Sequence, residues 1–539
     1  MIFSQPEAKT DKGQEDISWQ GALSILIALA GLGGYLNWHK FEPYYFRHFE
    51  VIYLTLYLLA VTLFGGLIVW QIVKHTKDFS VRARLLFAFA NPDRGLFVGI
   101  TTDGLRLYLP DDIRIGHVQI LGSTGRGKTE SVIIPWLARD ILAGRSVILL
   151  DGKGDPDIVD KICKVAGHIA PAPELCVFDL GNPTTSCTTN PLAHGSAQQI
   201  TDRIFTAFEF GDAYYKSVQY DVCSSVVSLM LSAPKDGETT PQRVTFERLY
   251  RLLTDEEALS AILVQSGNPL LEQKVSAYLS LPRQIREERL SGLLSQLAPF
   301  AIGEVAPLVN GRRNDETPDS TISKILLQGA SDGPKQKIFL ILLPTLKYQQ
   351  LGRQLGKLLL QELGWVVGER ASRTGRHSPF TPVYLDEFSA FVYPGFTNIL
   401  NKARSSQIPF HLSHQSLGDL EMVSPEFAQV IATNTNVKCI LGLNDPESAD
   451  FMARHMGTRT EEKLTEQAEK NGFLDPKRRT GALSIREVES YKIHPNDLKG
   501  YVNGRGVIHF PSPRGNVTEE IQFTRLSVGD FMNRGRGNG

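Results

Sequence analysis

Residues 122–129 carry the clearest potential chemistry in the sequence. They read Gly-Ser-Thr-Gly-Arg-Gly-Lys-Thr and match the pattern G-x-x-x-x-G-K-[ST] at every fixed position. Glycines let backbone N–H groups approach a phosphate chain, Lys128 can reach the β- and γ-phosphates, and the Thr129 hydroxyl can hold Mg²⁺. The pattern predicts a loop that binds the phosphates of a nucleoside triphosphate with Mg²⁺, made by Gly122, Ser123, Thr124, Gly125, Arg126, Gly127, Lys128 and Thr129.

Two adjacent carboxylates, Asp386 and Glu387, follow the apolar residues 382–385. Asp386 is expected to hold Mg²⁺ opposite Thr129, and Glu387 to orient and polarise the attacking water. Gln415 follows a strand expected over 408–412 and suits a sensor of the γ-phosphate. An acidic pair alone is equally typical of a strand end at the surface, but a complete phosphate loop upstream favours catalysis.

Three further charged residues remain open to two interpretations. Arg404 ends an expected helix and is either an arginine finger that reaches a neighbouring subunit's nucleotide or an ordinary surface arginine. Asp151 and Lys153 follow an apolar strand over 146–150. They lie near the nucleotide or the neighbouring subunit, or they only make a turn soluble.

The elements around the phosphate loop predict an α/β fold. A strand over 117–121 leads into the loop and a helix over 130–143 leaves it. Further apolar runs over 146–150, 175–180, 337–343, 408–412 and 437–443 alternate with helical stretches. Such alternation predicts a parallel sheet covered on both faces by helices, with its ligand at the carboxyl ends of the strands.

Other segments follow different patterns. Residues 96–101 and 105–109 predict a β-hairpin, and 506–510 and 519–523 predict final strands. Residues 196–310 have helical periodicity and predict an all-α insertion, whose arginines either face nucleic acid or are solvated: Arg243, Arg248, Arg251, Arg283, Arg286 and Arg289. The charged residues 458–495 suggest a loop with short helices.

Two uncharged stretches near the N-terminus, residues 17–39 and 51–73, are each 23 residues long. This length crosses a hydrocarbon core of about 30 Å. The connection between them predicts a transmembrane hairpin, and the basic residues after the second span, such as Lys74 and Arg82, place both termini in the cytoplasm. A cleaved signal peptide is the alternative for the first stretch, but the second stretch that follows it argues against this. A buried core helix is the alternative for the second stretch, but its length and lack of charge argue against that.

Composition limits the remaining possibilities. The 539 residues suggest two to four domains, and 57 basic against 58 acidic residues confine any DNA-binding surface to a local patch or pore. The five cysteines show no metal-ligand spacing and are interpreted as ordinary thiols of a reducing compartment: Cys163, Cys176, Cys187, Cys223 and Cys439.

The sequence thus predicts six parts. They are a cytoplasmic tail (1–16), the transmembrane hairpin (17–79), a first part of the nucleotide-binding domain (80–195), the all-α insertion (196–310), a second part of the nucleotide-binding domain (311–525) and a disordered tail (526–539).

Together these features resemble the coupling proteins of type IV secretion and conjugation systems, the TraD/TraG-like family. Smaller signs are Asn190-Pro-Leu192, His414-Gln-Ser-Leu417, Ile493-His-Pro-Asn-Asp-Leu498 and Gly504-Arg-Gly506. The resemblance implies a RecA-like P-loop ATPase in a homo-hexameric ring on the bacterial inner membrane. Its site residues would be Lys128, Thr129, Asp386, Glu387 and Gln415, with Arg404 acting in trans.

One motif departs from the family pattern. The family's Asp-Pro-Lys-Gly-Glu is here Asp151-Gly-Lys-Gly-Asp155, without the proline. The charges are retained, but the role of Asp151 and Lys153 stays open.

The resemblance further implies an ATP hydrolase that couples a relaxase, bound to its origin DNA in the relaxosome, to the type IV secretion channel. It would pump single-stranded DNA during conjugation. Two alternatives remain open. One is a membrane receptor that delivers protein effectors under control of ATP, and the other is a double-strand DNA translocase of the FtsK/HerA kind.

Overall fold

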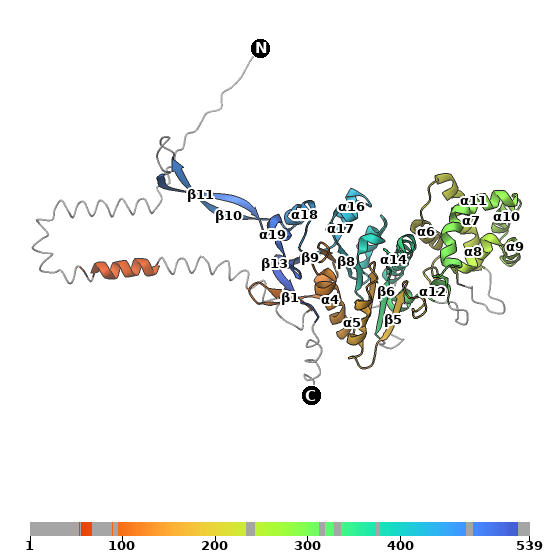
Figure 1. Cartoon of the computed structure of the whole chain (residues 1–539), viewed down its shortest axis with the longest axis horizontal. Helices are drawn as coiled ribbons and strands as arrows, with labels where there is room; N and C mark the ends of the chain where they lie inside the picture. The colour runs from red at the N-terminus through yellow and green to blue at the C-terminus, as the bar shows by residue number, and fades with distance from the viewer. Residues whose placement is uncertain are drawn as a thin grey trace, which may run out of the picture. The chain divides into compact units, whose positions relative to one another are not determined.

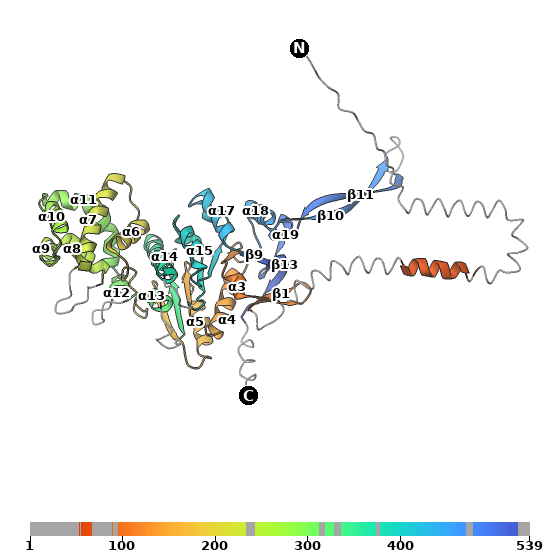
Figure 2. The ribbon, with the colours of Figure 1, turned by 180° about the vertical axis from the view of Figure 1, so that it is seen from behind.

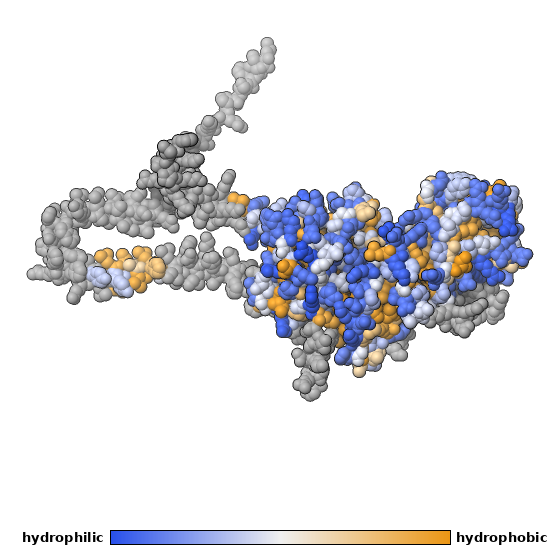
Figure 3. Space-filling model, viewed as in Figure 1, coloured by the Kyte–Doolittle hydropathy of each residue, from blue (hydrophilic) through white to orange (hydrophobic). Residues whose placement is uncertain are grey.

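The computed structural model describes residues 53, 55–66, 89, 95–232, 243–311, 319–327, 336–372, 378–469 and 478–526. The chain divides into two compact units, Met1–Arg84 and Leu85–Gly539. In the first unit, residues 55–66 are helical and expose apolar side chains such as Leu56, Leu59 and Phe64 (Figure 3). Among the described residues, no helix combines the length and hydropathy that a membrane crossing requires. The expected span over 17–39 lies outside the described residues, and the span over 51–73 lies only partly within them.

The second unit is built on a sheet in which eleven described strands follow the order β2-β1-β13-β12-β9-β3-β8-β7-β4-β6-β5 (Figure 1). The strands are β1 (Leu96–Thr101), β2 (Arg106–Leu109), β3 (Val118–Leu121), β4 (Val147–Asp151), β5 (Glu174–Asp179), β6 (Lys337–Leu342), β7 (Val383–Asp386), β8 (Phe410–His414), β9 (Val437–Leu441), β12 (Arg505–Ser512) and β13 (Gly515–Phe523).

The strands from β9 to β5 are parallel to their neighbours, as the sequence predicts. The expected hairpin of β1 and β2 is confirmed, but the predicted parallel sheet is incomplete, because β12, β13, β1 and β2 join the same sheet through antiparallel pairs. The reason is the short connections: only Pro513 and Arg514 separate β12 from β13, and a parallel pair needs a long crossover. The sheet is therefore mixed.

Helices cover both faces of the parallel part. One face packs against α4 (Ile134–Leu142) and α5 (Pro156–Ala166) through strand residues such as Ile120 and Leu149. The other face packs against α14 (Gln349–Ser372), α15 (Phe396–Ala403) and α17 (Pro425–Asn434), through residues such as Leu385 and Leu412. The strands are buried on both sides, which explains why they are continuous apolar runs.

A helical segment connects β5 to β6, and its described residues contain no strand. It comprises α6 (Ala197–Ala207), α7 (Ala213–Ser232), α8 (Phe246–Thr254), α9 (Glu256–Val264), α10 (Pro269–Leu279), α11 (Arg283–Ala301), α12 (Ala306–Asn310) and α13 (Thr321–Leu326). Most of these helices lie beyond the β5 edge of the sheet, where α6 packs on α14 (Figures 1 and 2). We call α6 to α13 the helical segment.

Several arginines of the helical segment pair with carboxylates of the same segment. Four of them form ion pairs: Arg243 with Asp319, Arg251 with Asp255, Arg283 with Glu287 and Arg286 with Glu256. For these four arginines, the pairs favour the interpretation that they are ordinary charged surface positions rather than a nucleic-acid contact.

Residues 458–495 differ from the expected loop with short helices. They form a two-stranded antiparallel ribbon of β10 (Thr458–Glu469) and β11 (Arg478–Tyr491), followed by α19 (Pro495–Gly500) (Figure 1). The sequence concealed the ribbon because strands outside a packed sheet need no apolar face, so no alternating pattern identifies them.

Two of the five cysteines form a disulfide, so the prediction that all are ordinary thiols is wrong for Cys176 and Cys187. Their Cα atoms are 6.0 Å apart. The chain leaves β5 and returns beside it, where the Cys187 N–H donates to the Val177 carbonyl at 2.8 Å. The other three cysteines are free.

A buried carboxyl lies where α6 packs on α14. Glu362 on α14 is 1% exposed, so its carboxyl group is almost completely removed from water. Burial raises the pKa of Glu362 to about 8, although the nearby Arg203 guanidinium acts in the opposite direction. A glutamate in the unfolded chain ionises near 4.5.

We therefore expect Glu362 to make unfolding depend on pH. Because its pKa is higher in the folded state, its contribution to stability is complete below about pH 4.5 and is lost as the pH rises to about 8. When the pH rises from 5 to 8.5, the wild type should lose about 2–4 kcal/mol more unfolding free energy than Glu362→Gln, which has no carboxyl group to ionise at this position. Urea unfolding at both pH values measures this difference, with Glu369→Gln on the same helix as control; equal losses in wild type and Glu362→Gln would contradict it.

Candidate nucleotide-binding site

The phosphate loop follows β3 and precedes a π-helical turn, Thr129–Ile133, that continues into α4. Gly125 and Gly127 have φ values of 77° and 86°, which favour glycine. A Cβ atom on Gly127 would lie 2.1 Å from Oδ1 of Asn503. Among the hydrogen bonds of the described residues, the N–H groups of Gly125 and Gly127 donate none, so the loop fits a phosphate anion.

Lys128 and Thr129 each make a polar contact within the site. The Lys128 side chain is 6% exposed, and its Nζ donates to the Gly122 carbonyl at 2.7 Å. The Thr129 Oγ1 donates to Asp386 Oδ2 at 2.6 Å. Thr129 and Asp386 therefore supply two adjacent oxygens of the kind that Mg²⁺ prefers.

Gln415 connects the phosphate loop to Glu387. The Thr124 Oγ1 donates to Gln415 Oε1 at 2.7 Å, and the Gln415 Nε2 donates to Glu387 Oε2 at 3.1 Å. This contact depends on strand order, because β8 lies between β3 and β7. We call Thr124, Lys128, Thr129, Asp386, Glu387 and Gln415 the catalytic cluster.

The backbone at Glu387 is unusual. Its φ and ψ are 49° and 44°, in the left-handed region that residues other than glycine seldom occupy. Such a conformation is typical of functional sites, where the surrounding structure holds a side chain in one direction. Here it accompanies the contact of Glu387 with Gln415.

Asp151 lies beside the cluster and Lys153 lies away from it. In the register of β4 and β7, Asp151 is opposite Asp386. Its carboxylate accepts from the N–H groups of Lys153 and Asp155 at 2.9 and 2.7 Å. Burial, and then the charge of Asp386, raise the pKa of Asp151 to about 7. Lys153 is exposed and pairs with Asp155.

Sequence reasoning missed two contacts of the phosphate loop, one with Asn444 and one with residues 501–504. Arg126 donates to the Tyr501 carbonyl at 3.1 Å and to Asn444 Oδ1 at 3.0 Å, and its own carbonyl accepts from Gly504 N–H at 3.1 Å. Asn444 could have been found, because it follows β9 at the carboxyl edge of the sheet. Tyr501 contributes only its backbone carbonyl here, so its side-chain type gives no signal.

Arg404 lies outside the catalytic cluster of its own chain. It is exposed at the end of α15 and precedes the amino end of β8, whereas Gln415 follows the carboxyl end. Its positive charge acts on His117, which precedes β3. Burial lowers the pKa of His117 to about 4, and Arg404 contributes to a smaller degree. Within one chain, the phosphate loop therefore lies at the carboxyl ends of the parallel strands and Arg404 lies at their amino ends.

The sheet order and the phosphate loop define an α/β protein with a P-loop fold. Three solved structures share the fold. The bacterial conjugative coupling protein TrwBdeltaN70 in its unbound form matches with a TM-score of 0.55 at 14% identity, over 83% of this chain and 92% of that one. The plasmid coupling protein TrwB in complex with ADP and Mg²⁺ matches with a TM-score of 0.54 at 13% identity, over 82% and 92%. VirB4 of Thermoanaerobacter pseudethanolicus matches with a TM-score of 0.50 at 15% identity, over 81% and 98%.

Sequence comparisons are more specific. Residues 381–499 match the family model described as the TraM recognition site of TraD and TraG. The type 4 coupling protein DotL of Legionella pneumophila subsp. pneumophila is 22% identical over 467 residues, which cover 76% of this chain and 58% of DotL. The chain thus spans little more than half the length of this relative. The sequence and structure comparisons thus agree in pointing to the TraG/TraD family of type IV coupling proteins.

Proposed function

We propose that this chain is an ATP-hydrolysing motor of the inner membrane that couples the relaxosome to a type IV secretion channel and pumps single-stranded DNA. The observation that carries the proposal is the catalytic cluster, in which Gln415 contacts both the phosphate loop and Glu387. A site that only bound nucleotide would not need a carboxylate held against a γ-phosphate sensor.

The residues of the cluster divide the chemistry among them. When bound at Thr129 and Asp386, Mg²⁺ would neutralise phosphate charge. Lys128 exchanges its bond to the Gly122 carbonyl for the phosphate oxygens. Glu387 holds the attacking water and accepts its proton, while Gln415 Nε2 orients the same carboxylate and Thr124 keeps Gln415 in place.

The proposal also includes a membrane anchor, a ring that holds DNA and a contact with a partner protein. The spans over 17–39 and 51–73 anchor the motor, with both termini in the cytoplasm. Six copies form the ring, and a basic channel along its axis holds the DNA backbone without sequence preference. Residues 381–499, which match a TraM recognition model, contact a relaxosome protein.

In such a ring, Arg404 completes the site of the neighbouring subunit. Because it lies far from its own phosphate loop, Arg404→Ala should leave nucleotide binding intact and lower ATP turnover about 1,000-fold. When Arg404→Ala subunits are mixed with Lys128→Ala subunits, some interfaces regain a complete site and turnover should return. Turnover unaffected by Arg404→Ala would remove this assignment.

The motor function is tested by ATP turnover of the detergent-solubilised full chain with single-stranded DNA, double-stranded DNA or no DNA. We expect single-stranded DNA to give the largest stimulation. Stronger stimulation by double-stranded DNA would favour a translocase of the FtsK/HerA kind. Nucleotide binding without turnover under every condition would reject the motor and favour an ATP-controlled receptor for protein cargo.

A further inference from the structure

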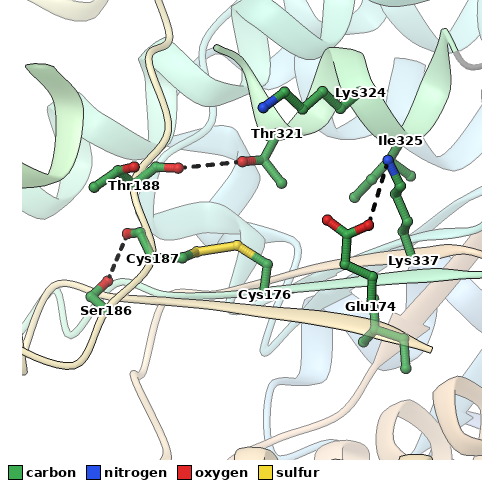
Figure 4. A pocket seen from close by; sticks show the side chains of 10 residues that line it. Glu174, Cys176, Ser186, Cys187, Thr188, Thr321, Lys324, Ile325 and Lys337 are labelled. Carbon is green, nitrogen blue, oxygen red and sulfur yellow. Dashed lines mark hydrogen bonds and ion pairs between the residues drawn. A yellow bond between two sulfur atoms is a disulfide. The ribbon is translucent and has the colours of Figure 1, made fainter. Parts of the chain in front are cut away.

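A cavity of about 320 Å³ lies under the edge strand β5, away from the catalytic cluster. Its lining includes the disulfide Cys176–Cys187 together with Lys324 on α13 and Lys337 on β6 (Figure 4). Both cysteines are partly exposed and line the cavity. Disulfides in reducing compartments are usually transient, and exposed ones are the readily exchanged ones.

The charges around the cavity favour thiolates and acidic ligands. Lys337 pairs with Glu174 at 3.7 Å, whereas Lys324 is exposed and its ammonium makes no ion pair or hydrogen bond among the described residues. Cations near a cysteine stabilise its thiolate, which is the reactive form. An unpaired lysine beside a disulfide also suits the carboxylate of an incoming small thiol.

We propose that Cys176 and Cys187 form a thiol-exchange site for a small thiol that carries carboxylates, with Lys324 binding one carboxylate. The incoming thiolate attacks one sulfur atom and forms a mixed disulfide. The Cys176–Cys187 bond breaks, and its electron pair leaves on the other sulfur, which takes a proton. A second thiol then displaces the first, so that two small thiols become one small disulfide and the chain gains two thiols.

The disulfide lies where it can affect the attachment of the helical segment to strand β5. The chain that follows Cys187 bonds to that segment at several points: Thr189 N–H donates to the Leu308 carbonyl at 2.9 Å, and Asn190 Nδ2 donates to the Val244 carbonyl at 2.8 Å. Thr321 N–H donates to Thr189 Oγ1 at 3.1 Å. Oxidation ties these residues to β5, so the oxidised protein should melt about 3–8 °C higher than the reduced protein.

The test equilibrates the full chain in glutathione buffers of varied redox ratio, followed by alkylation of free thiols and mass spectrometry. We expect Cys176 and Cys187 to open and close together and to pass through a glutathione mixed disulfide, while the exposed Cys163 alkylates at every ratio. Permanent thiols at both positions, or a disulfide that glutathione never opens, would overturn the proposal.

The role of Lys324 is tested by comparing two thiols. Lys324→Gln should slow exchange with glutathione several-fold and leave exchange with the uncharged 2-mercaptoethanol unchanged. Lys164→Gln, an exposed lysine near the end of α5, should change neither rate. Equal slowing with both thiols would overturn carboxylate binding by Lys324. The double variant Cys176→Ser/Cys187→Ser should melt with the reduced protein at every redox ratio, and a melting temperature that still follows the buffer would overturn the link to stability.

Discussion

Glu387→Gln should reduce ATP turnover by about 100- to 10,000-fold, because a positioned general base contributes a factor of that size. The amide keeps the size of the side chain and can still contact Gln415, but it cannot accept the proton of the attacking water. Nucleotide affinity should stay within about threefold of the wild type, since the phosphate contacts come from the loop and not from Glu387. Steady-state phosphate release and fluorescent nucleotide titration measure the two quantities.

The matched control is Glu421→Gln, which removes an exposed carboxylate from the short helix after Gln415. It should keep full turnover. If Glu387→Gln retained more than about a tenth of the wild-type turnover, proton acceptance by Glu387 would be wrong. If it lost nucleotide binding as well, Glu387 would be holding the site together and not performing the chemistry.

Lys128→Ala should abolish hydrolysis by a different route, through loss of nucleotide binding. Lys128 is almost buried and, among the described residues, its ammonium donates to the Gly122 carbonyl, so it is held close to where phosphate oxygens must lie. Hydrogen bonds to charged groups contribute about 1.5–3 kcal/mol, so the dissociation constant of ATP should rise about 10- to 100-fold. Turnover at saturating ATP should also fall, because the lysine stabilises charge that develops during transfer.

Lys164→Ala is the matched control and should change neither constant. Thermal unfolding without nucleotide separates a binding defect from a folding defect: Lys128→Ala should lose the rise in melting temperature that ATP gives the wild type. An unchanged dissociation constant with lost turnover would show that Lys128 acts only on the transition state, and would contradict the binding part of this prediction.

The candidate site residues could be proposed from the sequence because each is part of a local pattern. The phosphate loop is a contiguous motif, and Asp386 and Glu387 end an apolar run that is a strand in the structure. Buried strands are apolar throughout, and helices next to the site have regular periodicity, so the strands of the parallel part were predicted within a few residues. That Gln415 meets both Thr124 and Glu387 depends on β8 lying between β3 and β7.

Other features were decided only by the tertiary structure. The antiparallel strands at one side of the sheet, the β10–β11 ribbon and the Cys176–Cys187 disulfide all depend on which segments lie side by side, and residue type alone does not encode this. Arg404 is the clearest case. The sequence left it open whether Arg404 is an arginine finger for a neighbouring subunit or a surface arginine. Arg404 precedes β8 and Gln415 follows it, so the full length of the strand separates the two residues within one chain. The sequence determined the chemistry that each strand end carries, whereas strand order and direction determined which of those ends meet.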